Sequence, residues 1–376
     1  MASVERRVRN GRIRWYVRYR DPAGKQRTKT FDRKMGPGGA DQFLVSIESA
    51  KLTGGYVDPA RGKATVATIA DAWLAGKVNL KPTTRERYEV ALRAHVLPHW
   101  GSTPLDRIEH SDVQDWIGQL VAGGQSGASV RKTYGVLVGI LDRAVRDKRL
   151  PVNPAKGVDL PAVREQPRRY LTAEQVTRLA NASALTDHPD PRLRGVFAQY
   201  RLAVLVLAYC GLRWSELAAL KVGRVNLLRR RIQIEEAVTE VNGRLVWGTP
   251  KSHASRSVPI PRFIADELMV HMAGRKADEL LFPSPLGGVL RNRAARRSWF
   301  DQAAETIGMA GMTPHELRHT AASLAVSAGA NVKAVQRMLG HASAALTLDR
   351  YADLFDSDLD GVAEKLDLVA RAAGVG

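Results

Sequence analysis

The sequence has little of several features that would place it in other protein classes. It contains a single cysteine, Cys210, among 376 residues, which excludes a disulfide within the chain and a cysteine cluster that holds a metal. No stretch approaches the ~20 apolar residues of a membrane-spanning helix. No apolar run follows the basic residues of the N-terminal MASVERRVRN, so a secretory signal is not expected. We therefore expect a cytoplasmic protein.

Acidic residues are also scarce relative to basic ones. The chain has 57 Lys and Arg against 38 Asp and Glu, and its formal net charge is +19. Such an excess indicates a polyanionic partner, of which DNA and RNA are the common ones. The excess is uneven, because residues 1–63 hold 15 basic and only 6 acidic side chains. We interpret this segment as a dedicated nucleic-acid arm.

The arm has the pattern of a small β-sheet. Residues 12–20, RIRWYVRYR, alternate arginine with apolar side chains, which predicts a strand with one apolar and one basic face. The turn chemistry of Asp21-Pro22-Ala23-Gly24 predicts a second strand over 25–31, and a helix is expected over about 40–52. A solvated basic hairpin is the plainer alternative, but a strand pair can enter the major groove of DNA. The candidate DNA contacts are Arg12, Arg14, Arg18 and Arg20.

Composition shifts divide the rest of the chain. Residues 53–66 are rich in Gly and Pro and predict a linker, 68–149 have helical periodicity throughout, and the Pro-rich segment 151–168 predicts a second linker. Short β-branched runs within 226–258, with a turn at Asn242-Gly243, predict a small antiparallel sheet. Pro82 suits the first turn of a helix, and Thr172 with Gln175 forms a capping box that predicts the start of another. The predicted class is multidomain α+β, with a small N-terminal sheet plus helix over 1–60, a four-helix domain over 64–160, and a mainly helical domain with a small antiparallel sheet over 168–376.

Two segments of the last region place a cation at a structural corner. Arg213 follows an apolar helix and a glycine, and Glu216 lies three residues later, where it could orient the arginine. Alone, this pattern is more often a salt bridge at a helix end. Lys251 lies at an expected hairpin tip, from which it can reach into a cleft. Alone, it is more often a solvated turn lysine.

A third segment, Thr313-Pro314-His315-Glu316-Leu317-Arg318-His319, predicts a helix start. Thr313 and Glu316 form a capping box. His315 and Arg318 then share one face, near a helix N-terminus that favours anions. The segment also matches the zinc-protease pattern H-E-x-x-H. We discount that alternative because Arg318 would place a fixed cation beside the metal ligands, Glu316 has a capping role, and no third ligand stands out.

A fourth segment is Leu339-Gly340-His341, which is followed ten residues later by Tyr351. Taken together, the four segments resemble one family, the tyrosine recombinases of the phage-integrase type. The flanking runs G-L-R-x-S-E-L, H-E-L-R-H-T and L-G-H also match, and the resemblance covers about residues 64–376. The arm resembles, more weakly, the arm-site-binding domain of phage integrases. The positions that match the family's active-site residues are Arg213, Lys251, His315, Arg318, His341 and Tyr351.

The resemblance implies an enzyme that cuts and rejoins DNA at specific sites. Tyr351 would attack the scissile phosphate and form a 3′-phosphotyrosyl bond that leaves a free 5′ hydroxyl. Arg213 and Arg318 would hold the nonbridging oxygens and stabilise the charge of the transition state. Because the covalent bond conserves the energy of the diester, no ATP is needed, and because arginines can take the place of a metal, no cofactor or metal is expected.

The remaining residues of the set would manage protons and hydrogen bonds. The resemblance implies that Lys251 is the general acid that protonates the departing 5′ oxygen. His315 would assist proton transfer from the tyrosine, whose unperturbed pKa is ~10. His341 would donate a hydrogen bond to the phosphate.

The resemblance also implies partners. The expected partners are double-stranded DNA, at core and arm attachment sites, and further copies of the chain in a homotetramer assembled on DNA. A host DNA-bending protein and an excisionase are further candidates. The expected location is the nucleoid. A terminal helix over about 359–373 is expected to pack onto a neighbouring subunit or back onto its own domain. The alternatives are a transposon integrase or a chromosome-resolving recombinase of the same family, and a DNA-binding accessory protein without catalysis, which the complete set of six residues argues against.

Overall fold

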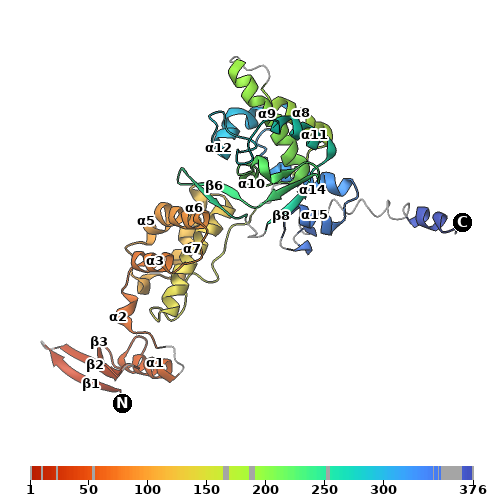
Figure 1. Ribbon diagram of the computed structural model, residues 1–376. Coiled ribbons are helices and arrows are strands. Elements are labelled where there is room, and N and C mark those ends of the chain that lie inside the picture. The colour runs from red at the N-terminus through yellow and green to blue at the C-terminus, as the bar shows by residue number, and fades with distance from the viewer. Residues whose placement is uncertain are drawn as a thin grey trace. The chain divides into compact units, whose positions relative to one another are not determined.

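The computed structural model is a mixture of helices and small antiparallel sheets (Figure 1), so the predicted α+β class is confirmed. The chain divides into two compact units, 1–165 and 166–376. No helix among the described residues has both the length and the apolarity needed to cross a bilayer. The structure describes residues 2–9, 12–22, 24–52, 56–163, 169–185, 191–250, 255–341, 343–345, 347–348 and 366–374.

The N-terminal sheet has three strands, one more than the sequence predicted. They pair antiparallel in the order β1-β2-β3. The added strand β1 was missed because four of its seven residues, SVERRVR, are charged, which hides the alternation. Val17 and Tyr19 of β2 pack in a small core with Ile47 of the following helix. The elements are β1 (Ser3–Arg9), β2 (Arg12–Arg20), β3 (Gln26–Phe31) and α1 (Ala40–Leu52).

The helical region of the first unit surrounds a core of its own, which includes Trp73, Trp100 and Trp116. Pro82 occupies the first turn of α4, as the sequence predicted. A short helix, α2, interrupts the predicted linker 53–66. The elements are α2 (Pro59–Gly62), α3 (Val66–Ala75), α4 (Pro82–Ala91), a π-helical turn (Leu92–Val96), α5 (Leu97–Trp100), a 3-10 turn (Leu105–Arg107), α6 (His110–Ala122) and α7 (Gly127–Arg146).

The second unit is built around the apolar helix α9, which packs against α8, α11 and α14 (Figure 1). The capping box of Thr172 and Gln175 is present at the start of α8. The helices among the described residues of this unit are α8 (Ala173–Ser183), α9 (Pro191–Cys210), α10 (Trp214–Leu217), a 3-10 turn (Val222–Arg224), α11 (Arg262–Met272), α12 (Asn292–Ala295), a π-helical turn (Arg296–Phe300), α13 (Asp301–Thr306), α14 (Pro314–Ser327), α15 (Val332–Leu339) and a helix over 366–372.

The strands of the second unit form two small antiparallel sheets, where the sequence predicted one over 226–258. One has the order β4-β5-β8 and the other is the ribbon β6-β7. The ribbon turns at Asn242 and Gly243, whose φ values of 49° and 76° are those that the Asn-Gly pair favours in a tight hairpin. The strands are β4 (Val225–Asn226), β5 (Arg231–Ile234), β6 (Ala237–Val241), β7 (Arg244–Gly248) and β8 (Arg256–Pro259).

Two glycines of α7 provide a matched test of the packing in the first unit. A Cβ at Gly139 would lie 2.9 Å from Nε1 of the buried Trp73, whereas a Cβ at Gly135 would meet nothing within 4 Å. Gly135→Ala should therefore stabilise the unit by up to about 1 kcal/mol through helix propensity. Gly139→Ala should instead destabilise it by about 1–3 kcal/mol, because the rigid indole must move. Urea unfolding of both variants checks this, and stabilisation by Gly139→Ala would contradict the packing.

Candidate active site

Arg213 stands at a sharp corner between α9 and α10. The chain turns at Gly211, whose φ is +67° and whose added Cβ would lie 2.8 Å from Cδ2 of Leu339, so only glycine fits. Arg213 is the residue that caps α10. Its backbone N–H donates to Glu216 Oε2 at 2.9 Å, and its Nη1 donates to Glu216 Oε1 at 2.8 Å.

A second arginine, which the sequence analysis did not single out, binds the same carboxylate. Arg256, at the start of β8, donates from Nη1 to Glu216 Oε1 at 2.8 Å and from Nη2 to Oε2 at 2.6 Å. Its Nε donates to the carbonyl oxygen of Met338, near the end of α15, at 3.1 Å. Glu216 is only 1% exposed, so one buried carboxylate joins two arginines from separate segments. The only sequence signal for Arg256 was its place in the Ser255–Pro259 run that follows Lys251.

The two arginines decide the charge state of Glu216. Burial by itself raises the pKa of the Glu216 carboxyl, but the hydrogen bonds and charge of Arg256, with the backbone N–H and charge of Arg213, outweigh it and lower the pKa to about 2. Glu216 is therefore ionised at neutral pH.

Arg318 lies on α14 and reaches the same corner. It is only 2% exposed. Its Nη1 donates to the carbonyl oxygen of Gly211 at 2.5 Å, and its Nη2 donates to the carbonyl oxygen of Leu339. Arg318 therefore ties the Arg213 corner to the end of α15. His315, one turn earlier on α14, is exposed, and its ring contacts that of His319 edge to face at 5.0 Å.

His341 follows directly after α15. Gly340 ends that helix in the left-handed region, with φ +65°, and a Cβ there would lie 2.8 Å from Cδ of Arg256. The backbone N–H of His341 donates to the Gln336 carbonyl at 3.1 Å, and its Nδ1 lies 2.9 Å from Thr347 Oγ1. The side chain is nearly buried. The glycine thus allows the end of α15 and Arg256 to approach each other closely.

The structure therefore brings several candidate site residues together in one network. Arg213 and Arg256 pair with Glu216, and Arg256 and Arg318 donate to carbonyls at the end of α15. His341 lies two residues after that helix end, and His315 lies on the same helix as Arg318. Lys251 and Tyr351 lie outside the described residues. Residues 366–372 are helical, whereas 359–365 of the expected terminal helix are also outside them.

The H-E-x-x-H segment has a different arrangement from a zinc site. Glu316 accepts hydrogen bonds from the backbone of Thr313 at 2.6 Å and from Nε of Arg169 at 3.0 Å, so its carboxylate caps the helix. Within the described part of the chain, no three His, Cys, Asp or Glu side chains converge as metal ligands.

Two of the candidate arm contacts have acidic partners in or next to the sheet. Arg14 pairs with Asp32, and Arg18 pairs with Glu5 at 3.1 Å. Such exposed ion pairs contribute little energy and open readily. Arg20 donates to the carbonyl of Gly24 at 2.9 Å, and Arg12 is exposed at the start of β2.

Comparison with known proteins identifies the family. The model of the phage integrase family matches residues 169–358, half of the chain, and the model of the phage integrase N-terminal SAM-like domain matches 65–121. The chain belongs to the phage integrase family. This confirms the resemblance and the enzyme class expected from the sequence, a site-specific tyrosine recombinase.

Individual proteins of the family are similar over most of this recombinase. The integrase of Mycobacterium phage D29 is 26% identical over 355 residues, which are 89% of this chain and 88% of that protein. The Tn1549 transposon integrase in complex with transposon right end DNA has a TM-score of 0.68 at 22% identity, with 80% of this chain and all of that one covered. A lambda integrase tetramer bound to a Holliday junction has a TM-score of 0.58 at 18% identity, over 90% and 95%.

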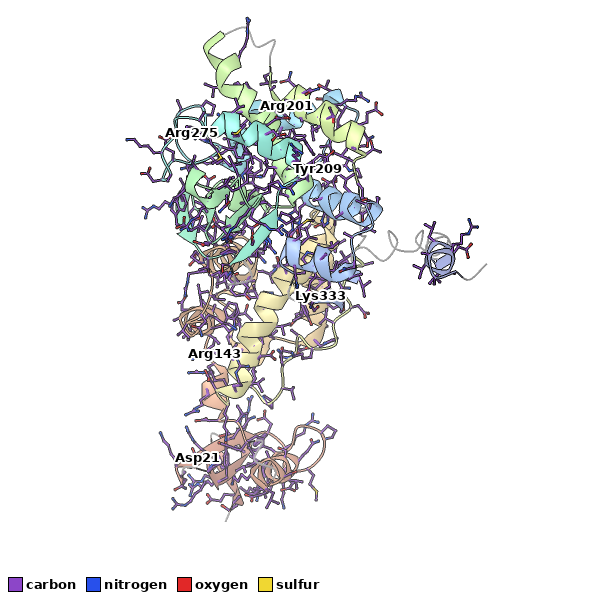
Figure 2. All side chains as sticks on the ribbon, turned by 45° about the vertical axis from the view of Figure 1, so that its right-hand side comes forward. Asp21, Arg143, Arg201, Tyr209, Arg275 and Lys333 are labelled. Atoms are coloured by element: carbon purple, nitrogen blue, oxygen red, sulfur yellow. The ribbon has the colours of Figure 1, made fainter. Side chains whose placement is uncertain are left out.

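Replacing the buried carboxylate tests the network. Glu216→Gln should destabilise the second unit by about 3–5 kcal/mol at neutral pH, because it leaves buried guanidinium charge without its partner. Glu267→Gln is the control, because it removes the partner of Arg201 (Figure 2) in a partly exposed ion pair. It should cost about 1 kcal/mol or less.

The same variant has a pH signature. The pKa of Glu216 is lower in the folded protein than in the unfolded chain, so its contribution is complete above about pH 4.5 and is lost as pH falls towards about 2. The difference in unfolding free energy between wild type and Glu216→Gln should therefore shrink over that range. Denaturant unfolding at a series of pH values measures it, and a difference independent of pH would contradict the assignment.

Proposed function

We propose that this recombinase integrates, and in the reverse direction excises, a phage or related mobile element through a 3′-phosphotyrosyl intermediate on Tyr351. The observation that carries the proposal is the arginine cluster in which Arg213 and Arg256 pair with Glu216, while Arg256 and Arg318 donate to carbonyls at the end of α15. Guanidinium groups bind the nonbridging oxygens of a phosphate bidentately and stabilise added negative charge. An arginine cluster fixed by a buried carboxylate is suited to one scissile phosphate.

The roles follow from the charge that each step develops. Arg213 and Arg318 bind the scissile phosphate, and Tyr351 attacks it while His315 assists proton transfer. The bond to the 5′ oxygen breaks, and Lys251 gives that oxygen its proton. His341 donates a hydrogen bond to the phosphate. In the second half of the reaction, a 5′ hydroxyl of the partner strand attacks the phosphotyrosine and releases Tyr351.

Arg256 is proposed as a positioning residue. Its guanidinium is committed to Glu216 and to the Met338 carbonyl, so its effect on the phosphate acts through Arg213 and through the end of α15.

The similarity to the phage D29 integrase supports the phage type, because it extends over nearly the whole length of both proteins. We propose that residues 1–60 bind arm sites, 64–160 bind the core site together with 168–376, and the last of these carries the catalysis. The lambda integrase tetramer on a Holliday junction supports a homotetramer on DNA for this chain too. A host DNA-bending protein, an excisionase and a nucleoid location remain predictions.

A transposon integrase is the second candidate, favoured by the fold similarity to the Tn1549 protein. Its chemistry at Tyr351 would be the same. The two differ in their DNA, because a phage enzyme joins an element site to a host site, whereas a transposon enzyme acts on the two ends of one element.

The nucleophile is tested by trapping the covalent intermediate. Full-length protein is incubated with a nicked core site, from which the cleaved strand can diffuse away. EDTA is present because no metal is expected to be needed. Wild type should form an adduct that survives a denaturing gel. Tyr351→Phe should form none while it binds DNA with nearly unchanged affinity, and Tyr88→Phe is the matched control that should form the adduct normally. An adduct from Tyr351→Phe at wild-type yield would contradict the assignment.

The general acid is tested with a modified leaving group. Lys251→Ala should cleave ordinary DNA about 10²–10⁴-fold more slowly, the range that general acid catalysis contributes. A substrate with sulfur in place of the bridging 5′ oxygen has a leaving group that needs no proton, and its cleavage by Lys251→Ala should be nearly as fast as by wild type. An equal loss on both substrates would remove Lys251 from the acid role.

A further inference from the structure

Three consecutive arginines lie where the turn after β4 leads into β5, with Arg229 and Arg230 in the turn and Arg231 as the first residue of β5. All three are exposed. Within the turn, the backbone N–H of Arg229 donates to Asn226 Oδ1 at 2.8 Å, and that of Arg230 donates to the Leu227 carbonyl at 3.1 Å. In the part of the chain that the structure describes, none of the three guanidinium groups has a carboxylate or hydrogen-bond partner, in contrast to Arg224, which pairs with Glu235.

The arginines line a hollow of about 360 Å³. Its other walls are Tyr209, near the end of α9 (Figure 2), and residues 259–261, which lead from β8 into α11. No acidic residue lines it. The first turn of α11 lacks acidic residues too, so the partial positive charge at that helix end adds to the field of the guanidinium groups. The hollow therefore favours an anionic ligand.

The backbone of the turn has a conformation that does not suit an arginine. Arg230 has φ +47°, in the left-handed region that glycine and asparagine adopt more easily. Its carbonyl accepts a hydrogen bond from Ile260 at 3.0 Å, which fixes the turn against the wall of the hollow. Glycine or asparagine would adopt this conformation with less strain. The presence of a long cationic side chain here therefore indicates that the side chain has a role.

The hollow is separate from the candidate active site. In the β5–β8 pairing, Ile234 lies opposite Arg256, and Arg231 lies opposite Pro259, three residues along each strand. Successive side chains of a strand point to opposite faces. Arg256 and Ile234 are on the face that covers the core and Glu216, whereas Arg231 is on the exposed face.

We propose that this hollow binds backbone phosphates of DNA outside the active site, which gives the recombinase an additional, sequence-independent DNA contact. The proposal rests on the proposed function only in taking DNA as the polyanion. The planar guanidinium group matches phosphate oxygens in a bidentate geometry, and neighbouring arginines can contact neighbouring phosphates of one strand. Contacts of this kind position a protein on the duplex without reading its sequence.

The salt dependence of binding measures how many phosphates the protein neutralises. The dissociation constant of the full chain for a non-specific duplex is measured over a range of salt concentrations. Replacing all three arginines by Gln should lower the slope of log K against log salt by about 0.9 for each phosphate that is no longer neutralised, whereas replacing all three by Lys should preserve most of it. Arg178→Gln, which removes one exposed charge from α8 of the same unit, should leave the slope unchanged.

Arg230→Asn separates binding from folding. Asparagine tolerates the left-handed conformation, so the melting temperature should stay the same or rise, while the salt slope falls by about one unit. A role in folding alone would lower the melting temperature and leave the slope as it is.

A chemical nuclease attached next to the turn locates the DNA. Leu228 is fully exposed beside the arginines, and the single native thiol, Cys210, is buried, which raises its pKa to about 12, so a Leu228→Cys variant can be labelled selectively. The reagent should cut bound duplex when attached at 228 but not at Val270→Cys, towards the other end of α11. An unchanged slope in the triple Gln variant, or no cutting from position 228, would overturn the proposal.

A third outcome would also overturn the proposal. If inorganic phosphate or tripolyphosphate binds at the hollow while the three Arg→Gln changes leave the salt slope of DNA binding unchanged, the hollow is a site for small anions. Failure here is distinguishable from failure of the proposed function, because the salt slope is measured on non-specific DNA without cleavage, whereas the proposed function is judged by the adduct at Tyr351.

Discussion

The buried carboxylate of Glu216 is the interaction on which the candidate active site depends. It accepts hydrogen bonds from Arg213 and Arg256 at 2.6–2.9 Å, and those two residues belong to separate segments of the chain. An ionised group inside a protein is tolerated only when it is paired and its hydrogen-bonding capacity is filled. Both conditions are met here, so the carboxylate holds the α9–α10 corner and the start of β8 in one arrangement.

The end of α15 completes this arrangement through its carbonyl groups. The last carbonyls of a helix have no partner within the helix. Here Met338 and Leu339 accept hydrogen bonds from Arg256 and Arg318, which fixes the end of α15 against these two arginines. Two glycines in the left-handed region, Gly211 and Gly340, make this close packing possible because a Cβ at either would clash. The two cations Arg256 and Arg318 thus shape the site by fixing the end of α15.

Local patterns in the sequence predicted much of this architecture. Capping boxes at Thr172 and Thr313, the proline at the start of α4 and the Asn242–Gly243 turn all depend on neighbours within a few residues, and all are present. The candidate residues Arg213, Arg318 and His341 came from spaced motifs whose chemistry is specific as a set. Domain boundaries and the catalytic roles stay predictions.

What the sequence did not reveal depends on contacts between distant segments. The pairing of Arg256 with Glu216 joins positions that no local pattern relates, and Arg318 reaches carbonyls of Gly211 and Leu339 on two other elements. Strand β1 lacks a clear alternation and is fixed by its pairing with β2. The ion pairs of Arg14 with Asp32 and of Arg18 with Glu5 also join β2 to other segments, so no local pattern predicts them.

A double-mutant cycle between Glu216 and Arg256 tests most directly whether this one carboxylate organises the site. The unfolding free energies of Glu216→Gln, Arg256→Met and the double variant are compared with wild type. Each single change leaves a buried polar or charged group without its partner, whereas the double change removes both partners. The account therefore predicts that the double variant loses less unfolding free energy than the sum of the two single losses, by about 2 kcal/mol or more. Additive losses would contradict the account, because they would mean that the two side chains stabilise the protein independently.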